Sequence, residues 1–149
     1  MARLAPKSCC AKGRDVACDT AGVYDEATAD AALAEIRRIC LDLPEATERL
    51  SHGSPTWFAG KKTMVMFLDD HHGDGRLALW VAAPPGVQSA MVAQEPERFF
   101  VPPYVGHRGW LGVRLDRTPD WDEVGDIVEE AYRQVAIQRL LRQLDAPPG

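Results

Sequence analysis

Two helical patterns enclose a middle section in which apolar and polar residues alternate, and this order constrains the fold most strongly. Between residues 28 and 43 apolar side chains recur every three or four positions, as in an amphipathic helix, and Pro44 ends the pattern. A second helix is predicted from Asp120, a suitable N-cap, to residue 144. Helices at both ends of a set of strands predict an α+β fold, with two layers and both helices on one face of an antiparallel sheet.

The predicted strands are short and are separated by turns rich in glycine and proline. They cover residues 46–51, 56–58, 62–68, 76–82 and 110–115. A short helix is expected after Pro84-Pro85-Gly86, and residues 99–109 are expected to be irregular.

Alternation in the last two strands predicts which side chains meet the helices, because successive strand side chains point to opposite faces. The set expected toward the helices is aliphatic: Leu77, Leu79, Val81, Leu111, Val113 and Leu115. The set expected on the opposite, open face is Arg76, Trp80, Trp110 and Arg114. Met64 and Met66 are expected to fill the core.

A length of 149 residues suits one domain. We expect residues 1–24 to form a disordered extension and residues 25–145 to form the single domain. No apolar run reaches the roughly 18 residues that a membrane helix needs, and no signal peptide is apparent, so we expect a cytoplasmic protein with no membrane partner. The spacing of Cys9, Cys10 and Cys18 does not match a zinc site, and Cys40 belongs to the apolar stripe of the first helix.

Charge is unevenly distributed along the chain. In total, 17 basic and 22 acidic residues give a net charge of −5. Residues 25–48 hold two basic and seven acidic residues, and residues 119–149 hold three and seven, whereas residues 49–118 hold eight and six. The expected helices are therefore acidic and the strand section is mildly basic, which suits an anionic partner on the open face of the sheet.

Four segments in a fixed order carry a family resemblance. They are Ile39–Glu45, Gly53–Phe58 with Lys61–Val65, Phe99–Gly106 running into Gly109–Leu111, and Trp121–Val124 with Ala131–Arg133. On these segments the chain resembles the MmcQ/YjbR family of small bacterial proteins over about residues 28–142. The resemblance implies a frataxin- or CyaY-like fold and a DNA-binding label, and it supplies no agreed catalytic residues.

Two groups of aromatic and basic residues are candidates for binding nucleic acid or another polyanion, since aromatic rings stack on bases and cations neutralise phosphates. The candidates are Trp57, Lys61, Lys62, Tyr104, His107, Arg108, Trp110 and Arg114. The structural alternative is that Trp57 packs in the core and that the 102–114 loop merely covers the sheet, with Trp110 as its plug.

We therefore expect a binding domain rather than an enzyme, with no catalytic residue, cofactor or metal. DNA or another polyanion is the first candidate partner, and the alternative is a protein or a small anionic ligand. A third candidate, from the frataxin likeness, is metal delivery by Asp25, Glu26 and Asp30. His52 is expected to be a turn residue, and the stretch from Asp69 to Gly75, including His71 and His72, is expected to be a solvated hairpin loop.

Overall fold

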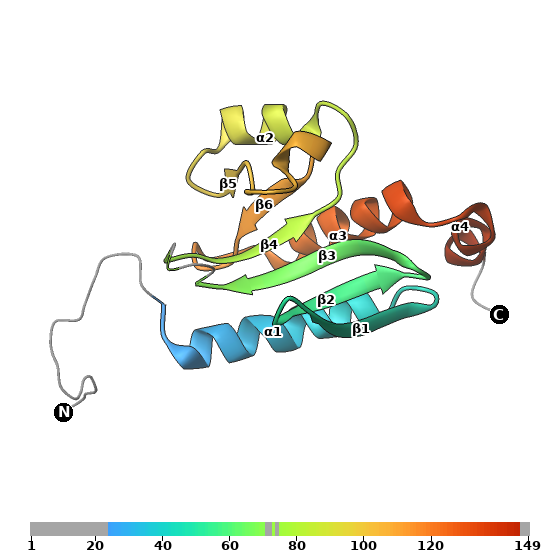
Figure 1. Ribbon diagram of the computed structural model, residues 1–149, viewed down its shortest axis with the longest axis horizontal. Helices are drawn as coiled ribbons and strands as arrows, with labels where there is room; N and C mark the ends of the chain where they lie inside the picture. Colours follow the sequence, from blue (N-terminus) through green and yellow to red (C-terminus); the bar gives the residue numbers. More distant parts are fainter. Residues whose placement is uncertain (1–23, 71–72, 74, 147–149) are drawn as a thin grey trace, which may run out of the picture.

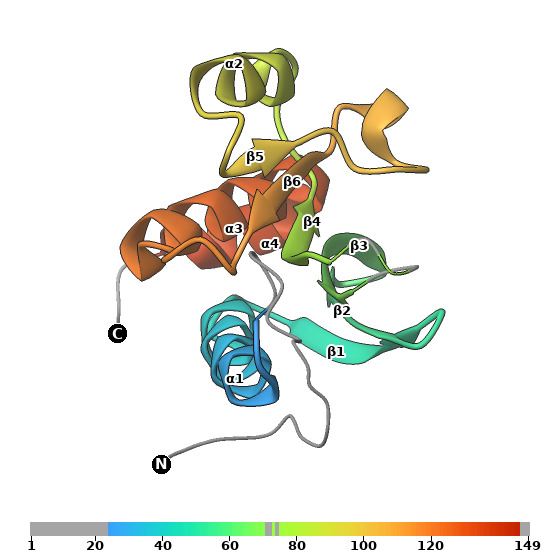
Figure 2. The same cartoon turned by 90° about the vertical axis from the view of Figure 1, so that its left-hand side faces the viewer.

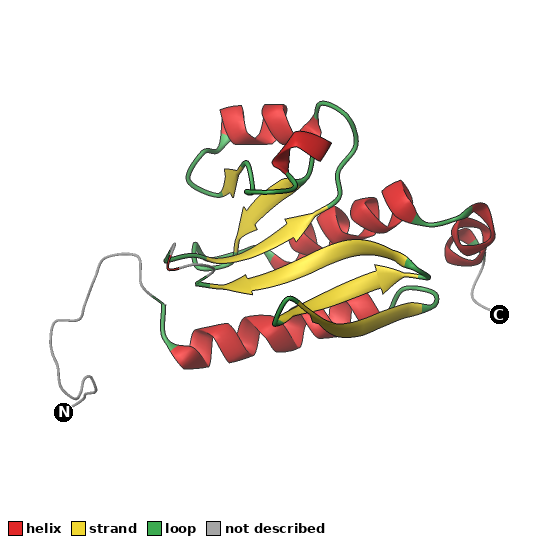
Figure 3. Ribbon diagram, viewed as in Figure 1, coloured by secondary structure: helices red, strands yellow, loops and turns green. Residues whose placement is uncertain are grey.

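A six-stranded antiparallel sheet forms the centre of the molecule (Figures 1 and 3). The computed structural model describes residues 24–70, 73 and 75–146. In chain order the strands are β1 (Ala46–Ser51), β2 (Ser54–Ala59), β3 (Lys62–Asp69), β4 (Leu77–Val81), β5 (Phe99–Phe100) and β6 (Leu111–Arg114). Across the sheet their order is β1-β2-β3-β4-β6-β5.

Two long helices cover one face of this sheet, which confirms the predicted α+β architecture. Figure 2 shows α1 (Glu26–Leu41) and α3 (Trp121–Val135) together on one side of the strands. Asp25 and Asp120 cap the two helices, because their carboxylates accept hydrogen bonds from backbone N–H groups of the first turn. A short helix, α2 (Val87–Gln94), lies beside β5.

The alternation predicted for β4 and β6 is correct. Val81 and Leu111 border a hollow that Ile127 of α3 also lines, so their side chains point toward the helices. Trp80 pairs with Met66 on one side and with Gly112 on the other, and therefore lies on the opposite face. Because the helices cover only one face, the other face is left for the loops that follow β1 and β5 (Figure 2).

The predicted last helix is interrupted, which corrects the sequence interpretation. Ala136 and Ile137 have extended backbones, and the chain resumes as α4 (Gln138–Asp145). The break turns Leu140 toward the β2–β3 turn, where its Cδ1 lies 3.5 Å from the position a Cβ would take at Gly60. Leu140 is buried there. The apolar residues assigned to one predicted helix are therefore buried by two successive helices, α3 and α4.

The segment expected to be irregular contains two ordered elements. β5 pairs with β6 at the edge of the sheet, and a 3-10 turn, η2 (Gly106–Arg108), precedes β6. Both elements are too short for periodicity to show in the sequence.

The expected 1–24 extension falls almost wholly outside the described residues. Tyr24 is described, and its hydroxyl donates a hydrogen bond to Asp69. His71, His72 and Asp74 of the expected hairpin loop also lie outside them. Within the part of the chain that is described, no helix combines the length and apolar character needed to cross a bilayer.

Phe100 packs directly on Gly112, its partner in the β5–β6 pairing. A Cβ at position 112 would lie 2.5 Å from two atoms of the Phe100 ring. The guanidinium of Arg76 lies over the same ring, 4.1 Å from its centroid. The Phe100 ring is therefore held between a glycine and an arginine.

We predict that Gly112→Ala destabilises the protein by about 1–3 kcal/mol, because the added methyl group must displace a packed ring. Gly125→Ala is the matched control: it lies within α3 with open space at its Cβ position, and alanine favours a helix over glycine by roughly 1 kcal/mol. Urea denaturation of both variants measures the difference. Equal stability of the two variants would contradict the packing described.

Candidate functional site

A cavity of about 550 Å³ opens on the face of the sheet away from α1 and α3. This volume lies in the range of small-molecule sites in proteins. Its floor is apolar and comes from adjacent strands: Met66 and Leu68 of β3 and Trp80 of β4. Thr63, nearer the start of β3, adds a hydroxyl.

Two loops form the rims of the cavity. The β1–β2 turn supplies Ser51, His52 and Ser54, and the loop between β5 and β6 supplies Tyr104, Val105, Arg108 and Trp110. Figure 2 shows both loops projecting from the same side of the sheet. The cavity is thus built by residues from distant parts of the sequence.

Each rim carries one aromatic residue in the left-handed backbone region. His52 has φ 52° and Tyr104 has φ 68°. In the β1–β2 turn, His52 and Gly53 both have positive φ, as a type I′ turn requires, and asparagine is the residue that such a turn usually takes at the first of these positions. Non-glycine residues held in this region cost about 1–3 kcal/mol and concentrate at functional sites.

The β5–β6 loop is held in place by α2. The side-chain amide of Gln88 donates hydrogen bonds to the backbone carbonyls of Gly106 (2.8 Å) and Trp110 (2.6 Å). A Cβ at position 106 would lie 2.5 Å from Val101, so only glycine lets the loop close this tightly without displacing its neighbour. The rim that carries Tyr104 and Arg108 is therefore anchored by the helix behind it.

Aromatic rings and one guanidinium give the cavity its chemical character. Trp80 and Tyr104 form a tilted ring pair with centroids 6.5 Å apart, and the Arg108 guanidinium lies 5.4 Å from the centroid of Trp110. Of the described residues that line the cavity, none is acidic. The arrangement favours a ligand with a flat apolar body and a negative charge.

Three of the eight predicted site residues meet at this cavity: Tyr104, Arg108 and Trp110. Tyr104 is 69% exposed at the rim, whereas Trp110 is only 4% exposed. The structural alternative considered for Trp110 is thus partly correct, because the indole is largely covered even though it borders the cavity.

Trp57 is wrong as a ligand-stacking residue. It lies opposite Glu48 in the β1–β2 pairing, and Glu48 accepts two hydrogen bonds of 2.7 Å from Arg37 of α1. These contacts place Trp57 on the helix-facing side, where it is fully buried. The same ion pair holds the pKa of Glu48 below its usual range, chiefly through the hydrogen bonds from Arg37.

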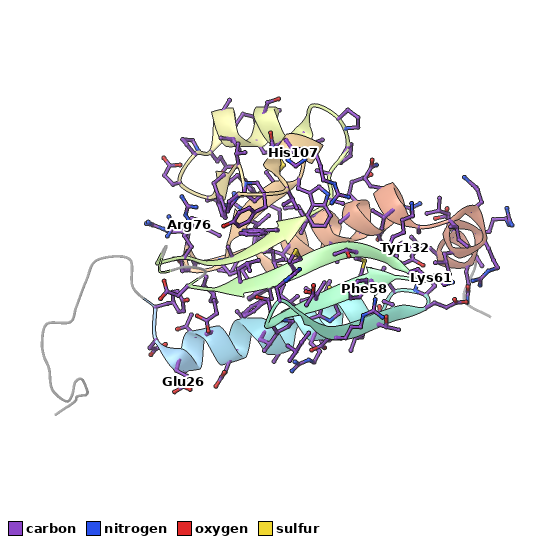
Figure 4. All side chains as sticks on the ribbon, viewed as in Figure 1. Glu26, Phe58, Lys61, Arg76, His107 and Tyr132 are labelled. Carbon is purple, nitrogen blue, oxygen red and sulfur yellow. The ribbon has the colours of Figure 1, made fainter. Side chains whose placement is uncertain are left out.

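The other predicted cations lie outside the cavity lining. Lys61 and Lys62 are exposed at the β2–β3 turn, and His107 is exposed on η2; Figure 4 shows Lys61 and His107 on separate parts of the molecule. Arg114 donates two hydrogen bonds to the carboxylate of Asp116, at 3.0 and 2.8 Å. Arg114 is therefore committed to an internal ion pair, which corrects its assignment as a phosphate contact.

Most of the floor and one whole rim of the cavity lie outside the set of residues predicted from the sequence. Alternation did place Trp80 on the open face, and the same logic applied across the β3–β4 pairing brings in Met66, which had been assigned to the core. Met64 does lie in the core. The serines of the β1–β2 turn gave no comparable signal, because their approach to the β5–β6 loop is set by the tertiary fold.

Three arginines stack on aromatic rings of the open face. Arg49 covers Phe58 at 3.9 Å, Arg76 covers Phe100, and Arg108 covers Trp110. Figure 4 shows Phe58 and Arg76 at well-separated positions, so these arginines are spread over the open face and do not form one cluster. The predicted segregation of acidic helices from a basic open face is in keeping with this arrangement.

A small acidic hollow lies at the start of α1, lined by Tyr24, Glu26, Asp69 and Asp70 among others. Burial, together with the hydrogen bond to Asp69, raises the pKa of Tyr24. In the described residues no group of three or more histidine, cysteine, aspartate or glutamate side chains has an arrangement that could hold a metal ion.

Comparisons with known proteins agree with the sequence resemblance. A solved structure, that of Deinococcus radiodurans protein DR2400 with a DUF419 domain, is similar in fold with a TM-score of 0.61 at 18% identity, over 77% of this chain and 88% of that chain. No curated protein matches. The family model described as YjbR matches residues 41–134, which include all six strands, both rims of the cavity and most of α3. The chain belongs to the YjbR family.

Proposed function

We propose that this domain is a non-catalytic binding module whose open-face cavity takes a compact ligand with a flat apolar body and an anionic group. One observation carries the proposal: an apolar, aromatic floor and a single guanidinium share one cavity of about 550 Å³. A flat group gains most by leaving water against Met66 and the exposed ring of Tyr104, and Arg108 supplies the charge that an attached anion needs.

The backbone conformations of two rim residues support the same proposal. His52 and Tyr104 sit on opposite rims in strained conformations, although other residue types would be accommodated more easily there. A ring at each rim, held by a turn or an anchored loop, is pre-organised and loses little freedom when a ligand binds.

DNA binding is the second candidate, and the specific observation that favours it is the set of arginines over the rings of the open face. Arg49, Arg76 and Arg108 would each neutralise one phosphate of a strand lying across the sheet. The buried Trp57 and the paired Arg114 weaken this candidate, since they remove one stacking residue and one cation from the predicted interface.

We predict that Arg108→Gln lowers the affinity for 8-anilinonaphthalene-1-sulfonate, a planar aromatic anion, by roughly five- to tenfold. The loss follows from removing a charge-assisted hydrogen bond at a partly exposed site. Fluorescence titration of the folded protein measures it. Arg142→Gln, an exposed arginine on α4, is the control and should leave the affinity unchanged.

Salt dependence separates the two candidates in the same titration. Binding of the sulfonate should weaken with a log–log salt slope no steeper than about 1, whereas three phosphate contacts on single-stranded DNA give a slope of roughly 2. Tighter binding of a 20-nucleotide oligothymidine than of the sulfonate, with the steeper slope, would replace the cavity proposal by DNA binding. Equal effects of the two arginine variants would also contradict it.

We also predict that His52→Asn stabilises the protein yet weakens sulfonate binding. Asparagine tolerates the left-handed region, so the free energy of unfolding should rise by about 0.5–1 kcal/mol, while the imidazole is lost from the rim. Thr118→Asn is the matched control, because Thr118 has φ 50° and does not line the cavity. It should stabilise the protein and leave binding unchanged; weaker binding in this variant as well would count against a role for His52.

A further inference from the structure

The lining of the cavity offers one permanent positive charge. Among its described residues only Arg108 carries a fixed charge, and Lys61, Lys62 and Arg114 lie outside it. A second negative charge on a ligand would enter an apolar site without a partner, which is unfavourable. The cavity therefore suits a ligand with a single negative charge.

The geometry of that charge favours a carboxylate. An arginine presents a planar fork of N–H donors that matches the two oxygens of a carboxylate. The Arg108 guanidinium is placed beside the Trp110 ring, a contact that limits the conformations the long side chain samples at the rim. The structure provides no helix N-terminus or glycine-rich loop among the described lining residues, such as a di- or triphosphate usually requires.

The opposite rim is polar without a fixed charge. Ser51 and Ser54 pair across the β1–β2 turn, and both line the cavity together with His52. Hydroxyl groups both donate and accept hydrogen bonds, so this rim matches a neutral polar group such as a hydroxyl or an amide. The two rims thus recognise two different ends of one molecule.

The floor between the two rims determines which chemical group fits the middle of the ligand. Met66 is half-buried and presents an apolar surface, and Leu68 and Trp80, which are almost fully buried, close the floor beside it. The thioether of Met66 can make favourable contacts with a flat aromatic ring. Tyr104, whose ring pairs with that of Trp80, adds an exposed aromatic ring to the same cavity.

We propose that the ligand is an aromatic carboxylic acid with a neutral polar group at its far end: carboxylate on Arg108, ring on Met66 and Tyr104, polar group on Ser51 and Ser54. This inference rests on the proposed function of the cavity, and it goes further by giving the ligand a charge, a shape and an orientation.

Four small probes test it by calorimetry on the full chain: 4-hydroxycinnamate, its methyl ester, cinnamate and adenosine 5′-monophosphate. We expect 4-hydroxycinnamate to bind at least tenfold tighter than the ester and a few-fold tighter than cinnamate. Arg108→Gln should abolish the preference for the acid over the ester. Ser54→Ala, with Ser51→Ala as a second variant, should abolish the preference for the hydroxyl group and leave the preference for the acid intact.

The possible results distinguish failure of the aromatic-acid assignment from failure of the proposed binding function. Equal affinity for acid and ester, or tighter binding of the nucleotide, overturns the aromatic-acid assignment. If the sulfonate binds in an Arg108-dependent manner and no acid does, the assignment is wrong and the cavity remains a binding site. If neither the acids nor the sulfonate binds, both are wrong.

Discussion

The pairing of Trp80 with Met66 on one side and with Gly112 on the other determines which side chains of the sheet face the helices and which face the cavity. Side chains in a strand alternate, so a shift of one residue would exchange Trp80 with Leu79 and Val81 and bring an indole into the helical layer. Gly112 also leaves room for Phe100, whose ring fills the space that a side chain would occupy. The face left bare by α1 and α3 thereby gains an apolar floor bounded by aromatic rings.

Two loops complete the cavity whose floor is set by the strand register. Gln88 of α2 ties two carbonyls of the β5–β6 loop, and the type I′ turn after β1 brings Ser51 and His52 to the other side of the floor. The backbone of the β5–β6 rim is thus held by a side chain of α2, while Tyr104 and Arg108 are exposed at the surface. This division between a packed scaffold and exposed rim side chains is the arrangement expected of a pre-organised binding site.

Sequence patterns predicted the helices, most of the strands and the division of β4 and β6 into two faces, because each rests on local periodicity. Trp57 was misjudged because both faces of β2 are covered from Thr56 to Ala59, so the strand shows no alternation between exposed and buried residues. The sequence prediction ran one helix across the break between α3 and α4, which is accompanied by the contact of Leu140 with the β2–β3 turn. The cavity could not be predicted from local patterns, because which loops meet depends on the tertiary fold.

The four tryptophans of the chain report directly on whether a ligand binds in the open-face cavity, because they are divided between the two sides of the sheet. Trp80 and Trp110 border the cavity, whereas Trp57 is buried toward α1 and Trp121 begins α3. Indole N–H signals followed by ¹⁵N NMR during titration with 8-anilinonaphthalene-1-sulfonate report each ring separately. We expect shifts for Trp80 and Trp110 and none for the other two; shifts confined to Trp57 or Trp121 would show that the ligand binds elsewhere.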